Sequence, residues 1–163
     1  MAVINIMHIF AQENIRIRMV DLLKKKQEAH DRLVKHGLRP SVQRVAIMAY
    51  LQIHRTHPTV EEVYQGLVKI IPTLSRTTVY NTLRLFSEHH AAQMITIDDH
   101  RVCYDGDIRP HVHFYCKRCG KVYDLMGEKA PEISSARLLD GHLVDEAQLY
   151  YKGICRECAS HRN

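Results

Sequence analysis

Two Cys-x-x-Cys pairs near the C-terminus constrain the fold more than any other feature of this 163-residue chain. Cys116 and Cys119 form the first pair, and Cys155 and Cys158 form the second pair, with 35 residues between the two pairs. A two-residue spacing lets both sulfurs of a pair face one ion, so the two pairs predict a tetrahedral Zn²⁺ site with four thiolate ligands. Disulfides within each pair would cross-link nothing distant, and a redox motif would need a thioredoxin-like context that is missing here. The fifth cysteine, Cys103, is expected to be a small buried side chain in a strand.

The N-terminal half carries the start and stop signals of four short helices. We expect these helices to cover residues 20–36, 42–53, 60–70 and 76–89. Gly37 is the predicted stop of the first helix, Ser41 and Ser75 are predicted N-caps, and Thr59 forms a capping box with Glu62. A hairpin pattern follows at 94–97 and 101–104, with a polar turn at 98–100. Short helices followed by such a hairpin predict a winged helix-turn-helix.

The change of pattern after the hairpin divides the chain, and we expect an α+β protein of two domains. Residues 1–18 are expected to form an N-terminal extension that is either flexible or packed against a partner. Residues 19–105 form the predicted winged helix. Residues 106–163 form a small α/β domain, which is too short to bury a large core and therefore depends on the structural Zn²⁺. Within it we expect strands at 111–115, 121–125 and 143–152 and a helix near 128–139.

The charge of the chain is unevenly distributed. Residues 1–92 carry 13 Lys and Arg against 7 Asp and Glu, whereas residues 93–163 carry 10 against 11. A basic half suits a polyanion, foremost nucleic acid, although a solvated basic surface would give the same balance.

No apolar run reaches the ~18 residues that a transmembrane helix needs. The apolar stretch Ala2–Phe10 lacks the basic start and the cleavage site of a signal peptide, so we expect a cytoplasmic protein without membrane contact.

The chain has an unusually large number of histidines, 12, and several of them are spaced as metal ligands often are. His111 and His113 are two residues apart on a predicted strand, so both imidazoles face the same side. Asp124 lies on the strand across the cysteine turn and could reach that side. Asp105 follows the hairpin, and His57 precedes the third helix. Taken singly, each is equally consistent with a surface histidine or a turn residue, and the sequence does not show that the five converge.

Four motifs, in matching order, resemble the ferric uptake regulator family. They are His57–Tyr64, Ser75–Arg84, His111–Lys121 and Gly153–Cys158, and the resemblance covers residues 20–160. It implies a dimeric, metal-responsive transcription factor rather than an enzyme. The N-terminal domain would be a winged helix, and the C-terminal domain would combine dimerisation with structural zinc. The family's operators are A/T-rich palindromes, so the implied partners are double-stranded DNA and a second copy of the chain.

The resemblance also implies a regulatory metal site. The peroxide-sensing branch of the family uses three His and two Asp ligands, which fall on His57, Asp105, His111, His113 and Asp124. This set of N and O ligands suits Fe²⁺ or Mn²⁺. Iron-sensing members usually carry Glu at the two Asp positions, so a peroxide-responsive repressor is favoured. An iron-, zinc- or haem-responsive regulator of the same family is the alternative.

The resemblance further implies how peroxide is sensed. Oxidation of a histidine ligand, His57 or His111, would release the ion and then the DNA. Ala147 stands where many iron-sensing members have an additional His, which argues against a second regulatory site unless Glu132 or His142 contributes by another geometry.

The predicted fourth helix supplies candidate DNA contacts. Asn pairs with adenine, and Thr and Tyr pack on thymine methyl groups, which suits A/T-rich sites. The candidates for base contacts are Arg76, Thr77, Thr78, Tyr80, Asn81 and Arg84. Lys35 and Arg44 are predicted phosphate contacts, and Val79 is predicted to lie in the core.

Two other classes of protein remain as rivals at this point. A zinc hydrolase could use His111, His113 and Asp124, but it would need a nucleophile or general base in a cleft, and the chain has no His-Glu-x-x-His motif. A zinc-ribbon adaptor would leave the basic winged helix without a role.

Overall fold

The computed structural model describes residues 21–98, 101–130, 137–144 and 147–160. One end, which we call the helical end, contains a helix over residues 21–35 and three more: α2 (Val42–Ile53), α3 (Val60–Leu67) and α4 (Arg76–Glu88). The hairpin of β1 (Gln93–Asp98) and β2 (Arg101–Asp105) follows. The other end, the sheet end, contains β3 (Val112–Cys116), β4 (Val122–Leu125), β7 (Tyr150–Gly153) and the short helix α5 (Arg156–Ser160). The mixed α and β architecture is as predicted.

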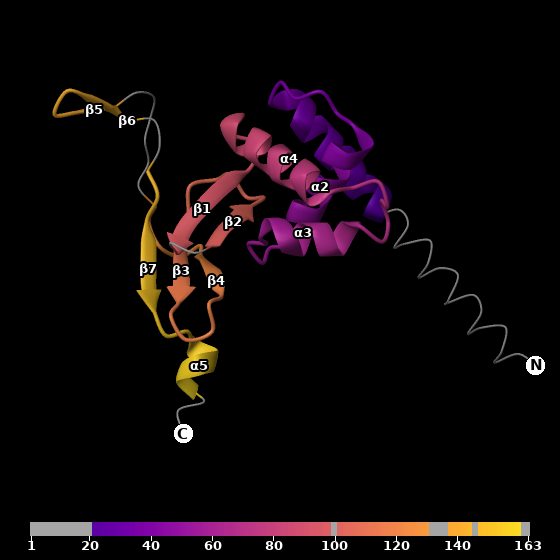
Figure 1. The fold of residues 1–163 in the computed structure, drawn as a ribbon. Helices are drawn as coiled ribbons and strands as arrows, with labels where there is room; N and C mark the ends of the chain where they lie inside the picture. Colours follow the sequence, from indigo (N-terminus) through magenta and orange to yellow (C-terminus); the bar gives the residue numbers. More distant parts are fainter. Residues whose placement is uncertain (1–20, 99–100, 131–136, 145–146, 161–163) are drawn as a thin grey trace, which may run out of the picture.

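The hairpin lies between the two ends of the molecule (Figure 1). The N-terminal extension predicted for residues 1–18 falls outside the described residues. Among the described helices, none combines the length and the apolar character that crossing a bilayer would require.

The helix boundaries follow the predicted capping signals closely. The hydroxyl of Thr59 accepts from the backbone N–H of Glu62, and the Glu62 carboxylate accepts from the backbone N–H of Thr59, which completes the capping box. Gly37 has a φ of 72° and ends the first helix, with its N–H bonded to the carbonyl of Val34. The predicted ends of the third and fourth helices are too late, since α3 stops at Leu67 and α4 at Glu88.

An apolar core joins the four helices of the helical end. Its fully buried members include Leu33, Ile47, Val63, Val79 and Phe86. The core therefore confirms the predicted burial of Val79. An exposed ion pair also links two of these helices. The Arg76 guanidinium donates to both carboxylate oxygens of Glu61, at 2.6 and 2.9 Å, and so connects the start of α4 to α3.

The hairpin packs directly on the sheet end. Ile95, Ile97 and Cys103 are buried between the two, against partly buried side chains of the sheet: Tyr115, Val122 and Tyr150. Arg101 adds a polar link by donating to the carbonyl oxygen of Gly120 at 2.5 Å. Burial of Cys103 confirms its predicted role as a small core side chain, whereas the predicted turn at 98–100 includes residues 99–100, outside the described part of the chain.

The sheet of the sheet end has the strand order β4-β3-β7. Strand β3 is antiparallel to β4, with His113 opposite Asp124, and parallel to β7, with His113 beside Tyr150. The central strand β3 thus contains His113, the second histidine of the predicted pair, and it ends at Cys116, the first of the four paired cysteines.

The helix predicted near 128–139 is wrong where the structure describes it, and the single strand predicted at 143–152 is only partly right, because residues 143–144 and 150–152 belong to two different strands and 147–149 to neither. Residues 137–144 form a separate hairpin of β5 (Arg137–Leu139) and β6 (His142–Val144), and β7 begins only at Tyr150. Asp140 and Gly141, at φ 48° and 83°, form its two-residue turn, and this pair is a strong hairpin signal. Residues 131–136 and 145–146 lie outside the described residues, so nothing is established for the middle of the predicted helix.

Candidate metal centres

Five potential ligand side chains converge where the helical end, the hairpin and the sheet end meet. His57 comes from the turn before α3, Asp105 ends β2, His111 precedes β3, His113 lies in β3 and Asp124 lies in β4. One ligand atom from each residue lies within 4.8 Å of every other. The four residues other than Asp124 are buried, and Asp124 is half-buried. The convergence that the sequence could not show by itself is therefore present.

The backbone on the helical side is arranged to deliver His57 to this point. His57 has a φ of 52°, a left-handed conformation that non-glycine residues rarely adopt and that clusters at functional sites. The carbonyl of the next residue, Pro58, accepts from the backbone N–H of Tyr104 at 3.0 Å, which ties the His57 turn to the end of β2.

Gly106 allows β2 to approach the end of α2 closely. A Cβ at Gly106 would lie 2.8 Å from the carbonyl oxygen of Leu51, which is closer than real contacts allow. A side chain here would displace the backbone next to Asp105. Gly106 could not be recognised from the sequence, because a glycine beside two aspartates is typical of an ordinary turn.

The ligand atoms of this cluster face one another without forming hydrogen bonds. His57 Nε2 lies 2.7 Å from Asp124 Oδ1, and His111 Nε2 lies 3.1 Å from Asp105 Oδ2. Even so, these four atoms and His113 Nε2 are buried and lack a partner in hydrogen-bonding geometry. Leaving such groups unsatisfied costs about 1–3 kcal/mol each. A single cation at their common centre would satisfy all five, so the cluster fits a metal ion.

The electrostatics of the cluster favour charged carboxylates. Burial alone would raise the pKa of Asp105, but the imidazoles of His111 and His113 more than offset this and hold that pKa well below its usual range. The same balance, with His111 and then His57 as partners, lowers the pKa of Asp124. In return, Asp105 and then Asp124 raise the pKa of His111 to about 10. Two anionic oxygens and three imidazoles form the set of hard and borderline ligands that Fe²⁺ or Mn²⁺ accepts.

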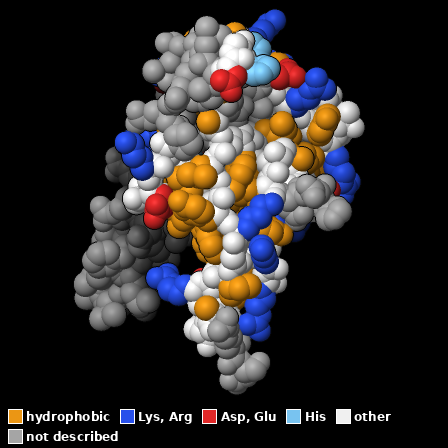
Figure 2. Space-filling view, turned by 90° about the vertical axis from the view of Figure 1, so that its left-hand side faces the viewer, with side chains coloured by type: hydrophobic (Ala, Val, Ile, Leu, Met, Phe, Trp, Pro, Cys, Tyr) orange, Lys and Arg blue, Asp and Glu red, His pale blue; other side chains and the backbone are white. Residues whose placement is uncertain are grey.

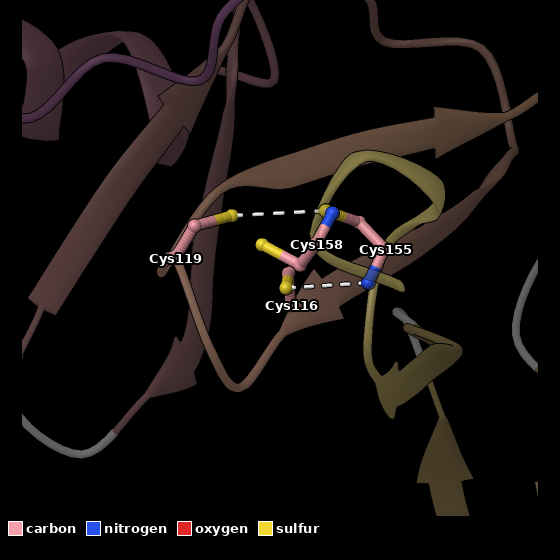
Figure 3. Close-up of side chains that lie close together, drawn as sticks. All are labelled: Cys116, Cys119, Cys155 and Cys158. Atoms are coloured by element: carbon pink, nitrogen blue, oxygen red, sulfur yellow. Dashed lines mark hydrogen bonds between the residues drawn. The ribbon is translucent and has the colours of Figure 1, made fainter. Parts of the chain in front are cut away.

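The four paired cysteines form the second centre (Figure 3). Cys116 ends β3, Cys119 lies in the following turn, Cys155 precedes α5 and Cys158 lies within α5. All four are free thiols whose sulfurs lie within 4.8 Å of one another. The sulfurs of Cys119 and Cys155 are 3.8 Å apart, and the edge of a tetrahedron with Zn–S bonds of about 2.3 Å has about this length.

Backbone groups around the cysteines support thiolates. The N–H of Cys155 donates to the sulfur of Cys116 at 3.3 Å, and the N–H of Cys158 donates to the sulfur of Cys155 at 3.4 Å. Burial opposes ionisation of Cys116, but backbone N–H groups, foremost that of Cys119, lower its pKa to about 6. Thiolate is the form that binds metal, so the cluster suits Zn²⁺.

The candidate DNA contacts occupy the surface of α4 and its neighbours. Thr77, Tyr80 and Asn81 are exposed on α4. Others are already engaged: Arg76 pairs with Glu61, Arg84 pairs with Glu88 at 2.8 Å, and the Thr78 hydroxyl lies 2.8 Å from that of the N-cap Ser75. The two predicted phosphate contacts lie outside α4. Lys35 is exposed, and the half-buried Arg44 donates to the carbonyl of Arg39.

Of the positions considered for a second regulatory site, the two that the structure describes lie outside both centres. Ala147 is exposed in a loop, and His142 is exposed in the separate hairpin of β5 and β6. Glu132 falls outside the described residues. Among the described residues, only the two clusters above bring three or more His, Cys, Asp or Glu ligand atoms together.

Comparison with known proteins gives one consistent result. The model of the ferric uptake regulator family matches residues 35–152. The peroxide-responsive repressor PerR of Staphylococcus epidermidis is 33% identical over 141 residues, which cover 84% of this chain and 92% of that protein. PerR of Staphylococcus aureus strain Mu50 is 32% identical over 136 residues, covering 81% and 90%.

Solved structures share the fold. The ferric uptake regulator Fur of Helicobacter pylori matches with a TM-score of 0.60 and 20% identity, covering 87% of this chain and 96% of that one. The ferric uptake regulator of Pseudomonas aeruginosa, solved with manganese, matches with a TM-score of 0.59 and 21% identity, covering 78% and 97%.

Proposed function

The chain belongs to the ferric uptake regulator family, and from this membership we propose that it is a metal-dependent, dimeric transcriptional repressor that responds to peroxide. The observation that carries the proposal is the convergence of three imidazoles and two carboxylates from both ends of the molecule on one point. Both carboxylates are aspartates, as the peroxide-sensing interpretation of the sequence requires. The similarity to peroxide-responsive repressors supports the same choice. As a repressor it would act in the cytoplasm, and regulation, not turnover, would be its activity.

The two centres would have separate roles. Zn²⁺ at Cys116, Cys119, Cys155 and Cys158 would be structural and would hold α5 against the sheet. Fe²⁺ or Mn²⁺ at the five-residue cluster would be regulatory. Because His57 belongs to the helical end whereas His111, His113 and Asp124 belong to the sheet end, an ion there would fix how the two ends sit. The ion would act by binding the arrangement with fixed ends more tightly than the arrangement with open ends. Shifting the ratio of fixed to open molecules from 1:99 to 99:1 takes ~5.5 kcal/mol of difference in binding free energy.

The fixed geometry matters because the protein would act as a homodimer. Strand β7 is an edge of the described sheet, and apolar side chains gather on the face of the molecule where it lies (Figure 2). Tyr151 in β7, Ile154 just after it and Met94 in β1 are exposed, which supports association with a second copy. The two α4 helices of a dimer would then enter an A/T-rich palindrome, whose half-sites must be about one DNA turn, or a multiple of it, apart.

Sensing would be a stoichiometric oxidation. Fe²⁺ held by the five-residue cluster would supply reversible one-electron chemistry that activates hydrogen peroxide, and the iron would have no net change of charge in the overall reaction. In the net reaction one peroxide oxygen replaces a ring C–H hydrogen of a histidine ligand as C–OH, and the other oxygen leaves as water. His57 and His111 are the proposed targets. Oxidised His57 would bind the ion poorly, and the helical end would then separate from the sheet end.

An operator titration tests the proposal directly. DNA binding should depend on Mn²⁺ or Fe²⁺, and peroxide should abolish it only for the Fe²⁺-loaded protein. Peptide masses should then show one added oxygen on His57 or His111. Metal-dependent binding that peroxide leaves intact, with no oxidised histidine, would refute peroxide sensing and leave the alternative, an iron-, zinc- or haem-responsive regulator of this family.

Tyr80→Ala should separate sequence reading from general DNA affinity. Tyr80 is 49% exposed on α4, so its removal should leave the core intact. Losing one base contact should weaken operator binding by ~1–3 kcal/mol. Fluorescence anisotropy with the operator and with a scrambled duplex measures both affinities. Equal losses on the two duplexes would show that Tyr80 has no role in sequence recognition.

A further inference from the structure

We propose that the ion pair between Asp107 and Arg109 is a clasp that positions two regulatory ligands, Asp105 and His111, and thereby sets the affinity of the regulatory site. Both partners lie in the segment that joins the hairpin to β3. The inference deepens the proposed function and rests on it, because the clasp has a role only if an ion binds at the cluster.

The first half of the clasp acts on Asp105. The backbone N–H of Asp107 donates to Asp105 Oδ1 at 2.8 Å. This hydrogen bond occupies one carboxylate oxygen and leaves the other, Oδ2, facing the imidazoles of the cluster without a partner. The position of the Asp107 backbone therefore decides where the ligand oxygen of Asp105 points.

The second half of the clasp acts on His111. Nδ1 of His111 lies 2.8 Å from the carbonyl oxygen of Arg109, so the ring donates Nδ1–H to this oxygen and directs the lone pair of Nε2 toward the cluster. Pro110 stands between the two residues and fixes its own φ, which stiffens the link. The position of the Arg109 backbone therefore decides where the second ligand points.

The Asp107–Arg109 pair locks these two backbone positions together. Arg109 Nε donates to Oδ1 and Oδ2 of Asp107, at 2.9 and 3.2 Å, and Arg109 Nη2 donates to Oδ2. The backbone N–H of Arg109 also donates to Asp107 Oδ1, at 3.1 Å. From β1, the Gln93 amide donates to the Asp107 carbonyl at 3.0 Å and anchors the segment to the hairpin.

A clasp can be distinguished from an ordinary surface ion pair by comparing its contribution to metal affinity with its contribution to folding stability. The Arg109 side chain is 71% exposed whereas that of Asp107 is 10% exposed; because solvent screens the exposed guanidinium, we expect the pair to contribute about 1 kcal/mol to stability. Loss of a group that orients a metal ligand typically weakens metal affinity about 10–100-fold. Removing Arg109 should thus affect metal binding much more than folding.

The sign of the effect provides a second distinction. Arg109 is a cation near a site for a divalent cation, so through-space repulsion alone predicts that Arg109→Gln binds the ion more tightly. The clasp predicts the opposite, because the ligand spacing relaxes when the pair is lost. Lys25→Gln is the matched control, since Lys25 is also an exposed cation paired with a carboxylate, Glu28, at 2.7 Å on the first helix.

The experiment measures Mn²⁺ affinity of the zinc-loaded full chain by electron paramagnetic resonance of free and bound Mn²⁺. Arg109→Gln should weaken binding about 10–100-fold and change the zero-field splitting of the bound ion, with little change in the thermal midpoint of the metal-free protein. Arg109→Lys, which retains the charge but not the fork, should lie in between. The double variant, Asp107→Asn with Arg109→Gln, should bind Mn²⁺ with about the affinity of the weaker-binding single variant, because the pair acts as a unit.

The outcomes separate the clasp from the proposed function. If the wild type binds Mn²⁺ and Arg109→Gln binds it equally or more tightly, the clasp is wrong while the regulatory site stands. If Lys25→Gln weakens binding as much as Arg109→Gln, the effect is not specific to the clasp and the inference also fails. If the zinc-loaded wild type binds no Mn²⁺, the proposed function fails and the clasp fails with it.

Discussion

Cys116→Ser should unfold the sheet end of the molecule even with Zn²⁺ in excess. Cys116 is fully buried at the end of β3, the central strand of the described sheet. Among the residues that the structure describes, the apolar cluster between the hairpin and this sheet has three buried members, Ile95, Ile97 and Cys103, so we expect the metal to contribute much of the stability of this end. Structural zinc sites contribute an apparent ~10–16 kcal/mol at neutral pH, which exceeds the whole stability of most small domains.

Zinc content by mass spectrometry and thermal unfolding by circular dichroism measure this effect together. Cys103→Ala is the matched control, since it also removes a buried sulfur but not a proposed ligand. The control should keep its zinc and lose only about 1 kcal/mol. A Cys116→Ser variant that unfolds at the wild-type temperature would show that the four cysteines are not a structural zinc site.

His57→Ala should abolish metal-dependent operator binding while leaving zinc content and folding unchanged. Among the five ligands, His57 is the one that the helical end supplies. Without it an ion could still bind the other four, but it would no longer hold α4 in place. The metal-free protein should tolerate the change, because removing two buried ring nitrogens that lack a hydrogen-bond partner offsets the loss of the charge contact between His57 and Asp124.

The readout is operator affinity with and without saturating Mn²⁺. The wild type should gain affinity with the metal, and His57→Ala should gain none. His30→Ala, which removes an exposed histidine of the first helix, is the control and should behave like the wild type. If His57→Ala still binds the operator more tightly with Mn²⁺ than without it, the ion does not act through the helical end.

Local features of this fold could be predicted from the sequence, and features that depend on distant contacts could not. Capping by Thr59 and the helix stop at Gly37 depend on neighbouring residues, so the sequence predicts them correctly. The five-ligand cluster joins residues from 57 to 124, and no periodicity or spacing in the sequence indicates that residues so far apart come together. Only the family resemblance predicted it.

Two features that the sequence did not predict, the hairpin at 137–144 and the Asp107–Arg109 pair, have different physical causes. The helix predicted near 128–139 neglected Asp140 and Gly141, whose positive φ angles turn the chain into a hairpin. Asp107 and Arg109 were not recognised because an ion pair between two residues of a connecting segment has no signature in a sequence. Their importance comes from hydrogen bonds made by their backbone atoms, which only the folded structure shows.

The central claim is that one removable ion joins the helical end to the sheet end. A crystal structure of the Mn²⁺-loaded protein bound to its operator, with anomalous scattering measured at the manganese edge, tests this most directly. We expect a single manganese peak within bonding distance of His57, Asp105, His111, His113 and Asp124. A peak held by the sheet-end ligands alone, with His57 turned away toward solvent, would contradict it.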